Sequence, residues 1–409
     1  MGIVKGLGCP RCGWQSPDRM ASLCPTCSGV LEVEVQIEHL TRSHLLEIRK
    51  RTDRTIWRWF EFLPIRDRSA IVSLGEGYTP LIKSRGLGDT LGISRLYLKN
   101  DTVLPTGSLK DRSMAVGLSR AKELGFKAAA VISTGNAAAS VAAYAAAAGL
   151  DSVVMVPSGI SASKVLQAQA YGAKVIVIDG DFEEAAKLYK KGIQEFGWFD
   201  CLSTNPYRNE GKKSYAYEIL DQLDAQVPDW IIHPTAGGTG ISAIWKGCNE
   251  LLRLGWVRRL PKLVAAQSDA AAPIVAAFEK GLSKVEPVAV RETVAESIQV
   301  GNPSSMGWRA LEAVRGSNGT AVALRDEEIL DAQSLLARRA GIFAEPAGAV
   351  SVAAARKLCE QGVMSQGDLV ICNITGHGLK QPSAVRVSEE ELRPVVPNLN
   401  ALKKRLGIA

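Results

Sequence analysis

Short apolar runs alternate with amphipathic or alanine-rich segments through the second third of the chain. The apolar runs predict strands at 128–133, 152–156 and 174–178, and the segments after them predict helices at 137–148, 162–171 and 183–196. A strand that is buried on both faces has a continuous apolar sequence rather than an alternating one. The pattern therefore predicts a parallel sheet covered by helices on both faces.

A second series of the same kind follows. Its predicted strands lie at 230–233, 263–267 and 369–373, and its predicted helices at 240–254, 326–340 and 347–361. Two consecutive series predict two α/β domains with a cleft between them. Ligands of such sheets bind beyond the carboxyl ends of the strands, so the loops at those ends are the candidate functional segments.

The N-terminal region differs from both series, because cysteines dominate it. Cys9 and Cys12 form one Cys-x-x-Cys pair, and Cys24 and Cys27 form a second pair eleven residues later. Two such pairs can turn four thiolates toward one point, which predicts a tetrahedral zinc site; disulfides are the alternative. With four protein ligands no position stays open for water, so the expected metal is structural. Alternating residues at 31–37 predict a strand that closes this zinc ribbon.

Composition and charge narrow the function classes. The 409 residues carry a net charge of +7 with both signs well mixed, and no basic run is interleaved with aromatics, so nucleic acid is not an expected partner. No apolar run approaches the roughly 20 residues that span a bilayer, and the N-terminus lacks a signal-peptide pattern, so no membrane partner is expected either. The other four cysteines are scattered, as in a reducing compartment, and we expect a cytoplasmic protein.

One lysine stands where it could act as a nucleophile. A turn containing Pro105 and Gly107 leads to Lys110, which opens a predicted helix that extends to about Gly125. The free amides of a helix N-terminus favour an anion nearby. A lysine in that position suits a Schiff base with an aldehyde cofactor that carries an anionic group. The alternative is an ordinary solvated surface lysine.

Three loops at predicted strand ends carry small polar residues. Segment 133–136 (Ser-Thr-Gly-Asn) can hold a carboxylate or simply cap the next helix. Segment 235–240 (Thr-Ala-Gly-Gly-Thr-Gly) has neither the P-loop nor the dinucleotide spacing, but its glycines let backbone amides approach a phosphate. Segment 375–380 begins with Thr375, whose hydroxyl could face a ring nitrogen; a tight turn is the alternative.

A fourth segment, 203–214, combines hydroxyls with cations. Arg208, Lys212 and Lys213 lie in it, which indicates a clamp for an anionic substrate group or a solvated charged loop.

Taken together, these motifs resemble those of the threonine synthases, which are pyridoxal-phosphate enzymes of the tryptophan-synthase-β-like fold, fold type II. The resemblance covers about residues 57–382 and rests on the motifs at 75–81, 105–112, 133–136, 205–214, 301–303 and 375–380. It implies an α/β protein with two open twisted sheets and a small N-terminal zinc-ribbon module. The predicted division is a zinc ribbon at 1–40, a large cofactor-binding domain at 41–111 and 211–409, and a small mobile domain at 112–210. A homodimer is expected from the family alone.

The resemblance also implies a role for each motif. Lys110 would hold pyridoxal 5'-phosphate as a Schiff base, Asn136 would bond its ring hydroxyl, and Thr375 would face its pyridine nitrogen. The cofactor phosphate would be held by Gly237, Gly238, Thr239 and Gly240. Ser133 and Thr134 would take the substrate carboxylate, and Ser203 and Arg208 the substrate phosphate.

The implied reaction converts O-phospho-L-homoserine and water to L-threonine and phosphate, by γ-elimination followed by addition of water at Cβ. Two positions depart from the family pattern in ways that bear on the substrate: Ala137 stands where a substrate-binding threonine is common, and Leu202 where an asparagine can hold the substrate phosphate. The alternatives are therefore other enzymes of the same fold, namely an O-phosphoserine β-replacement synthase such as cysteate synthase, or a serine/threonine ammonia-lyase. A non-catalytic member of the fold is a further alternative, against which Lys110 argues.

Overall fold

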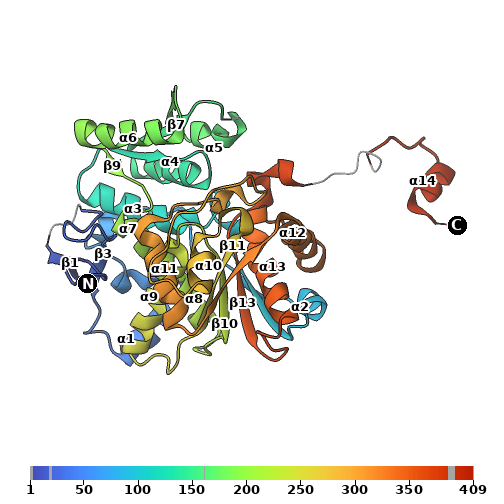
Figure 1. Ribbon diagram of the computed structural model, residues 1–409, viewed down its shortest axis with the longest axis horizontal. Coiled ribbons are helices and arrows are strands. Elements are labelled where there is room, and N and C mark those ends of the chain that lie inside the picture. Colours follow the sequence, from blue (N-terminus) through green and yellow to red (C-terminus); the bar gives the residue numbers. More distant parts are fainter. Residues whose placement is uncertain (1–2, 18–20, 161, 386–391, 409) are drawn as a thin grey trace.

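The computed structural model describes the chain except for residues 1–2, 18–20, 161, 386–391 and 409 (Figure 1). The residues left out belong to all three predicted domains: the zinc ribbon, the small domain and the large domain. For these residues the predicted division lies outside the described part of the chain. The described strands form three sheets, of six, four and three strands. Within the described part, no helix is long and apolar enough to cross a membrane.

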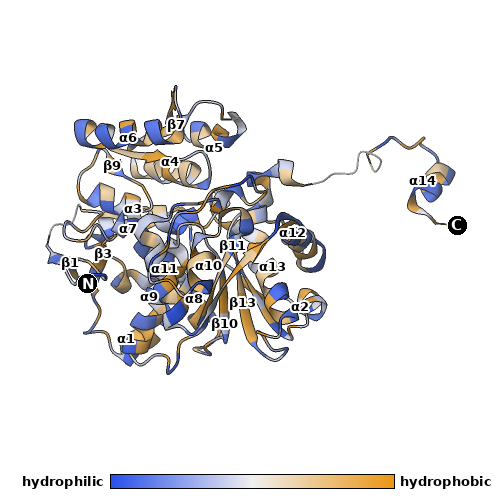
Figure 2. Ribbon diagram, in the orientation of Figure 1, coloured by the Kyte–Doolittle hydropathy of each residue, from blue (hydrophilic) through white to orange (hydrophobic). Residues whose placement is uncertain are grey.

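The six-stranded sheet forms the lower body of the molecule in Figure 1. Its strands, in spatial order, are β12 (Thr320–Leu324), β11 (Lys262–Ser268), β10 (Trp230–Pro234), β13 (Leu369–Ile374), β5 (Arg95–Asn100) and β4 (Leu81–Lys83). All neighbouring pairs are parallel except β4 with β5. The central strands are almost wholly apolar, as Figure 2 shows, because helices cover both of their faces.

Two sets of helices cover this sheet. Apolar residues on one face of the strands pack with α2 (Arg85–Leu91), α12 (Asp326–Ala340) and α13 (Pro346–Glu360). Those on the other face pack with α1 (Arg42–Lys50), α8 (Ser214–Gln222), α9 (Thr239–Arg253), α10 (Pro273–Glu279) and α11 (Ser304–Gly316). In β10, for example, Ile232 belongs to the first cluster and the adjacent Ile231 to the second. The predicted doubly covered parallel sheet is thus confirmed, with one antiparallel edge strand.

The four-stranded sheet lies above it in Figure 1 and is entirely parallel. Its order is β8 (Lys174–Ile178), β7 (Asp151–Pro157), β6 (Ala128–Ile132) and β9 (Phe199–Asp200). One face packs on α3 (Lys110–Glu123), α4 (Asn136–Ala148) and α5 (Leu166–Ala170), and the other on α6 (Phe182–Phe196). α7 (Pro206–Glu210) and a 3-10 turn at Gly211–Lys213 then lead back to α8.

The N-terminal sheet is antiparallel, with β2 (Gln15–Ser16), β1 (Ile3–Gly8) and β3 (Glu32–Gln36) in that order. It packs through its own apolar cluster, which includes Tyr207 of α7. The predicted strand at 31–37 is therefore confirmed as β3. At the other end, α14 (Leu399–Leu406) stands away from the body (Figure 1).

Two expectations need correction. The predicted helix at 162–171 is α-helical only over Leu166–Ala170, because Ala162–Lys164 forms a 3-10 turn and no side chain caps the start of α5. The sequence pattern also missed β5, a central strand that ends in Lys99 and Asn100. Lys99 lies fully buried in this strand because its ammonium pairs with Glu218 at 2.6 Å.

Candidate active site

Three neighbouring strands of the large sheet bring the predicted loops together. β10, β13 and β5 are adjacent and parallel, so their carboxyl ends lie along one edge of the sheet. The loops that follow are 235–238 after β10, 375–377 after β13 and 101–109 after β5. This arrangement explains why segments far apart in the sequence converge beside Lys110.

The lysine loop is joined to the loop after β13. The backbone N–H of Leu109 donates to the carbonyl of Thr375 at 2.9 Å, and that of His377 donates to the carbonyl of Gly107 at 2.8 Å. Gly107 has φ +78°, a left-handed conformation that glycine adopts without strain. Lys110 then opens α3, as predicted, and its position is fixed by backbone pairing rather than by its own side chain.

A narrow cavity lies at this junction. Its lining includes Lys110, Asn136, His233, Thr239, Gly240 and Thr375. Burial, and after it the positive charge of Arg208, lowers the pKa of Lys110 to about 8, against the opposing effect of the Glu345 carboxylate. At pH 7 about a tenth of an amine with that pKa is neutral and nucleophilic, a far larger fraction than for an ordinary surface lysine.

The buried carboxylate of Glu345, on the side of the cavity next to α13, accepts hydrogen bonds from Asn136. The side-chain amide of Asn136 donates to the two carboxylate oxygens of Glu345, at 2.9 and 3.1 Å. Both residues are buried, at 8% and 2% exposure. Asn136 is the first residue of α4, whereas Glu345 directly precedes α13. The predicted cofactor ligand is therefore oriented by a residue from the other sheet.

The glycine-rich segment forms the start of α9, and neighbouring side chains fill the space around two of its glycines. Gly238 has φ +101°, and a Cβ there would lie 2.6 Å from the Cβ of Ala310. At Gly240 a Cβ would lie 2.0 Å from Nε2 of His233. No side chain caps this helix, so its first amides face the cavity as free donors. Positions 238 and 240 therefore have no room for a side chain, as expected where backbone amides approach a phosphate.

The charges around the cavity fit a bound phosphate. Lys212 is 2% exposed, and its ammonium donates to the Thr239 hydroxyl at the start of α9. Burial, and after it the positive charges of Lys110 and Arg208, lower the pKa of Lys212. Three neighbouring cations beside an uncapped helix N-terminus form a donor set for a dianion. These residues therefore fit the phosphate and aldehyde groups of pyridoxal phosphate.

The predicted substrate residues lie farther along the small sheet. Ser133 and Thr134 follow β6 and are half-buried, and neither lines the Lys110 cavity. Ser203 is exposed, and its carbonyl accepts from the Asn209 side chain. Arg208 is buried; its Nη1 donates to the Cys201 carbonyl at 2.8 Å, while its Nε has no partner within the described structure.

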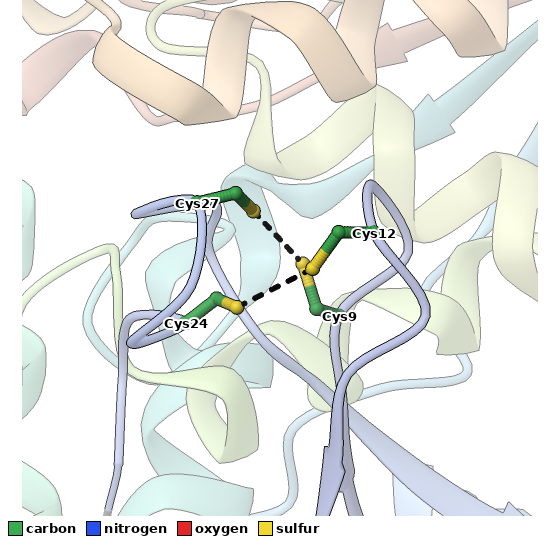
Figure 3. A group of neighbouring side chains, drawn as sticks. All are labelled: Cys9, Cys12, Cys24 and Cys27. Atoms are coloured by element: carbon green, nitrogen blue, oxygen red, sulfur yellow. Dashed lines mark hydrogen bonds between the residues drawn. The ribbon is translucent and has the colours of Figure 1, made fainter.

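The four N-terminal cysteines gather at one point (Figure 3). All their sulfur atoms lie within 4.8 Å of one another, with Cys9 and Cys27 Sγ 3.5 Å apart and Cys12 and Cys24 Sγ 3.6 Å apart. In a tetrahedral site with Zn–S distances of about 2.3 Å, the sulfurs lie about 3.8 Å apart. None of the four forms a disulfide. The arrangement fits a zinc ion.

Sequence reasoning missed Glu345 and His233, and it considered Lys212 only as part of a clamp for an anionic substrate group. Glu345 lies just before the predicted helix at 347–361, so it has the pattern of an ordinary cap. His233 ends an apolar strand, where a buried histidine is unremarkable. Its ring hydrogen-bonds the Asn373 side chain at 3.1 Å, and burial lowers its pKa to about 3, so it stays neutral.

Solved structures share this fold. The chain aligns with tomato threonine deaminase isoform 2 at a TM-score of 0.64 and 19% identity, over 75% of this chain and 87% of that one. It aligns with Escherichia coli diaminopropionate ammonia lyase at a TM-score of 0.65 and 17% identity, over 84% and 91% of the two chains. At these identities the likeness establishes the fold, and it confirms the predicted fold type II architecture.

Sequence relatives carry the assignment further. The profile of the family described as "Pyridoxal-phosphate dependent enzyme" matches residues 72–376. Threonine synthase of Methanocaldococcus jannaschii is 43% identical over 97% of this chain and 98% of its own length. That of Methanosarcina acetivorans is 40% identical over 98% of each, and that of Mycobacterium tuberculosis is 39% identical over 85% and 94%. The resemblance read from the motifs is thus confirmed, and the chain belongs to the pyridoxal-phosphate-dependent enzymes and, among them, to the threonine synthase family.

Proposed function

We propose that this protein converts O-phospho-L-homoserine and water to L-threonine and inorganic phosphate. The observation that carries the proposal is the partly desolvated amine of Lys110, with a pKa of about 8, beside an uncapped glycine-rich helix start. The names of relatives that align over nearly the whole chain support the same activity. The reaction takes up one water and releases one phosphate, so it is redox-neutral.

Each residue around the cavity would have a separate role in the reaction. When bound, pyridoxal phosphate supplies an electron sink that stabilises negative charge at the substrate Cα. Lys110 would hold the cofactor and, once the substrate amine has displaced it, would move protons at Cα and Cβ. Asn136 would bond the ring hydroxyl, and Thr375, buried in the lining, would face the ring nitrogen. A neutral hydroxyl does not keep that nitrogen protonated, which favours elimination and replacement over transamination.

The substrate would bind to a different set of residues, which lie outside the Lys110 cavity. We propose that Ser133 and Thr134 take its carboxylate and that Ser203 and Arg208 take its phosphate. The unpartnered buried Nε of Arg208 supports this role, because a buried guanidinium donor without an acceptor is costly. Since the serines and Thr134 lie outside the Lys110 cavity, substrate binding would require the four-stranded sheet to move toward the large sheet.

We also propose that the four cysteines bind zinc and that the metal is structural. The spacing of the sulfur atoms supports this, and four thiolates complete a tetrahedral site. A homodimer and a cytoplasmic location stay predictions; the family resemblance supports the first, and the unpaired state of Cys201, Cys248, Cys359 and Cys372 is consistent with the second.

The deciding experiment supplies purified protein with O-phospho-L-homoserine or O-phospho-L-serine and measures phosphate release and the amino-acid product. Threonine and phosphate in equal amounts from the first substrate alone are the expected result. Turnover of the second substrate alone would contradict the proposal. It would mean that Ala137 and Leu202, which depart from the family pattern at positions that bear on the substrate, mark a different substrate.

A further inference from the structure

Lys212 occupies a rigid position between the two sheets. It lies in the 3-10 turn Gly211–Lys213, which packs against α3 so closely that a Cβ at Gly211 would lie 1.8 Å from the carbonyl oxygen of Arg112. On its other side, the Lys213 ammonium is held by Glu210 at 2.7 Å and Glu250 at 2.9 Å. The backbone on both sides of Lys212 is therefore fixed. Its side chain extends to Thr239 at the start of α9.

The two adjacent lysines differ in their charge environment. Lys213 is neutralised by two carboxylates, whereas Lys212 has no ion pair within the described residues. The charges that act on Lys212 are those of Lys110 and Arg208, and both are positive. His233 is neutral and cannot compensate them. A fully buried ammonium among like charges is strongly unfavourable unless an anion joins it.

The position for that anion is set by the hydrogen bond of Lys212. Its Nζ donates to Oγ1 of Thr239, the first residue of α9, which follows the left-handed Gly238. The Lys212 charge and the free amides of α9 thus act on the same point. The Nε of Arg208, in α7 just before this 3-10 turn, has no acceptor within the described structure. It is therefore available to bind a second anion.

We infer that Lys212 is the counter-cation of the cofactor phosphate and fixes that phosphate at the start of α9. This inference rests on the proposed cofactor site at Lys110 and adds a residue to it. Lys212 would then set how tightly the cofactor is held, while Arg208 would serve the phosphate of the substrate. It is a positioning residue, since its ammonium meets the end of the cofactor that does not react.

The test compares pyridoxal 5'-phosphate with pyridoxal, which has the same aldehyde but no phosphate. Cofactor-free wild type, Lys212→Met and Lys212→Gln would each be titrated with both compounds, following the absorbance of the lysine-bound form. We expect the Lys212 variants to bind pyridoxal phosphate about 10- to 100-fold more weakly, as for loss of a charged hydrogen bond. Affinity for pyridoxal would change less than about twofold. Lys187→Met, which removes an exposed lysine, is the charge-matched control.

A second readout is the phosphorus NMR shift of the bound cofactor as a function of pH. A neighbouring ammonium keeps the phosphate dianionic, so in wild type its second pKa lies below the ordinary value of about 6. In Lys212→Gln, which keeps a donor for Thr239 without the charge, that pKa would rise. A purely structural role for Lys212 would not change it.

Three outcomes would overturn the inference. The first is an equal loss of affinity for both compounds, the second an unchanged phosphate titration, and the third full pyridoxal phosphate affinity with a raised KM for the phosphorylated substrate. That last result would assign Lys212 to the substrate. Failure of the cofactor site itself is distinguishable, because wild-type protein would then form no lysine-bound species with either compound.

Discussion

The side-chain amide of Asn136 spans the two carboxylate oxygens of Glu345, at 2.9 and 3.1 Å, and so joins residues 209 positions apart. One belongs to the helix that follows β6 of the four-stranded sheet, and the other to the loop before α13 on the six-stranded sheet. Ser297 adds a contact of 3.4 Å to the same amide. Any motion of the small sheet that takes Asn136 away from Glu345 therefore breaks a buried, charge-assisted hydrogen bond.

Glu345→Ala should disturb Asn136 directly. A hydrogen bond to a charged group contributes about 1.5–3 kcal/mol, so we expect turnover to fall about tenfold to a hundredfold. Glu345→Gln keeps one acceptor oxygen and should lose less. Steady-state kinetics of both variants, with circular dichroism as a fold check, test this. An alanine variant as active as wild type would show that the contact does not position Asn136.

Lys110→Ala should abolish turnover, because the variant lacks the amine that holds the cofactor and moves protons. The absorbance of the lysine-bound cofactor should vanish, while the thermal midpoint of the cofactor-free protein should stay within a few degrees, since Lys110 makes no side-chain ion pair within the described residues. Lys110→Arg keeps the charge and should be equally inactive. Normal turnover by either variant would exclude the proposed role.

Cofactor uptake should depend on pH through Lys110. Only the neutral amine attacks an aldehyde, and the pKa of Lys110 is lowered to about 8, first by burial and then by Arg208. The uptake rate should rise about tenfold per pH unit below about pH 8 and level off above it. In Arg208→Gln the pKa of Lys110 should rise, moving the plateau to higher pH. A wild-type rate that keeps rising to the pKa of an ordinary lysine would contradict this.

Cys9→Ser should lose zinc. The remaining three thiolates leave the tetrahedral site incomplete, so metal analysis should give far less than one zinc per chain. Cys359→Ser, at a cysteine outside the cluster, is the control and should keep the metal. If the Cys9 variant retains one zinc per chain, the four-thiolate site is wrong.

Glu218 should stabilise the fold in a pH-dependent way. It accepts from Arg112 at 2.5 Å and pairs with Lys99 at 2.6 Å, and these charges lower its pKa to about 2 from 4.5 despite burial. Because the folded-state pKa is lowered, its contribution is complete above about pH 4.5 and is lost as pH falls toward 2. Removing one partner of a buried pair costs about 3–5 kcal/mol.

Urea denaturation of wild type and Glu218→Gln at a series of pH values tests this linkage. The difference in unfolding free energy should be large at pH 7 and should shrink as the pH falls below about 4.5. Glu360→Gln, whose ion pair with Arg356 is exposed, should differ little from wild type at any pH. A constant difference for Glu218→Gln would show that its charge does not act through Arg112 and Lys99.

The sequence alone determined most strands and helices of the two α/β series and where most functional loops lie. Short apolar runs such as 230–233 and 369–373 predicted strands buried on both faces, and β10 and β13 confirm them. Parallel strands present their carboxyl ends together, so the sequence is enough to identify the loops after them as a candidate site. The local spacing of Cys9, Cys12, Cys24 and Cys27 was sufficient to predict that the four cysteines cluster, because each pair spans a single turn.

Only the tertiary structure decided which charges are buried and with what partners. Lys99, Lys212 and Glu345 have the sequence context of surface residues, and their burial depends on groups more than a hundred positions away or on a neighbouring loop. Sequence patterns report the average polarity of a segment, whereas the cost of a buried charge is settled by the geometry of its partners. For this reason the carboxylate of Glu345 and the burial of the cavity's cations depend on the way the two sheets pack together.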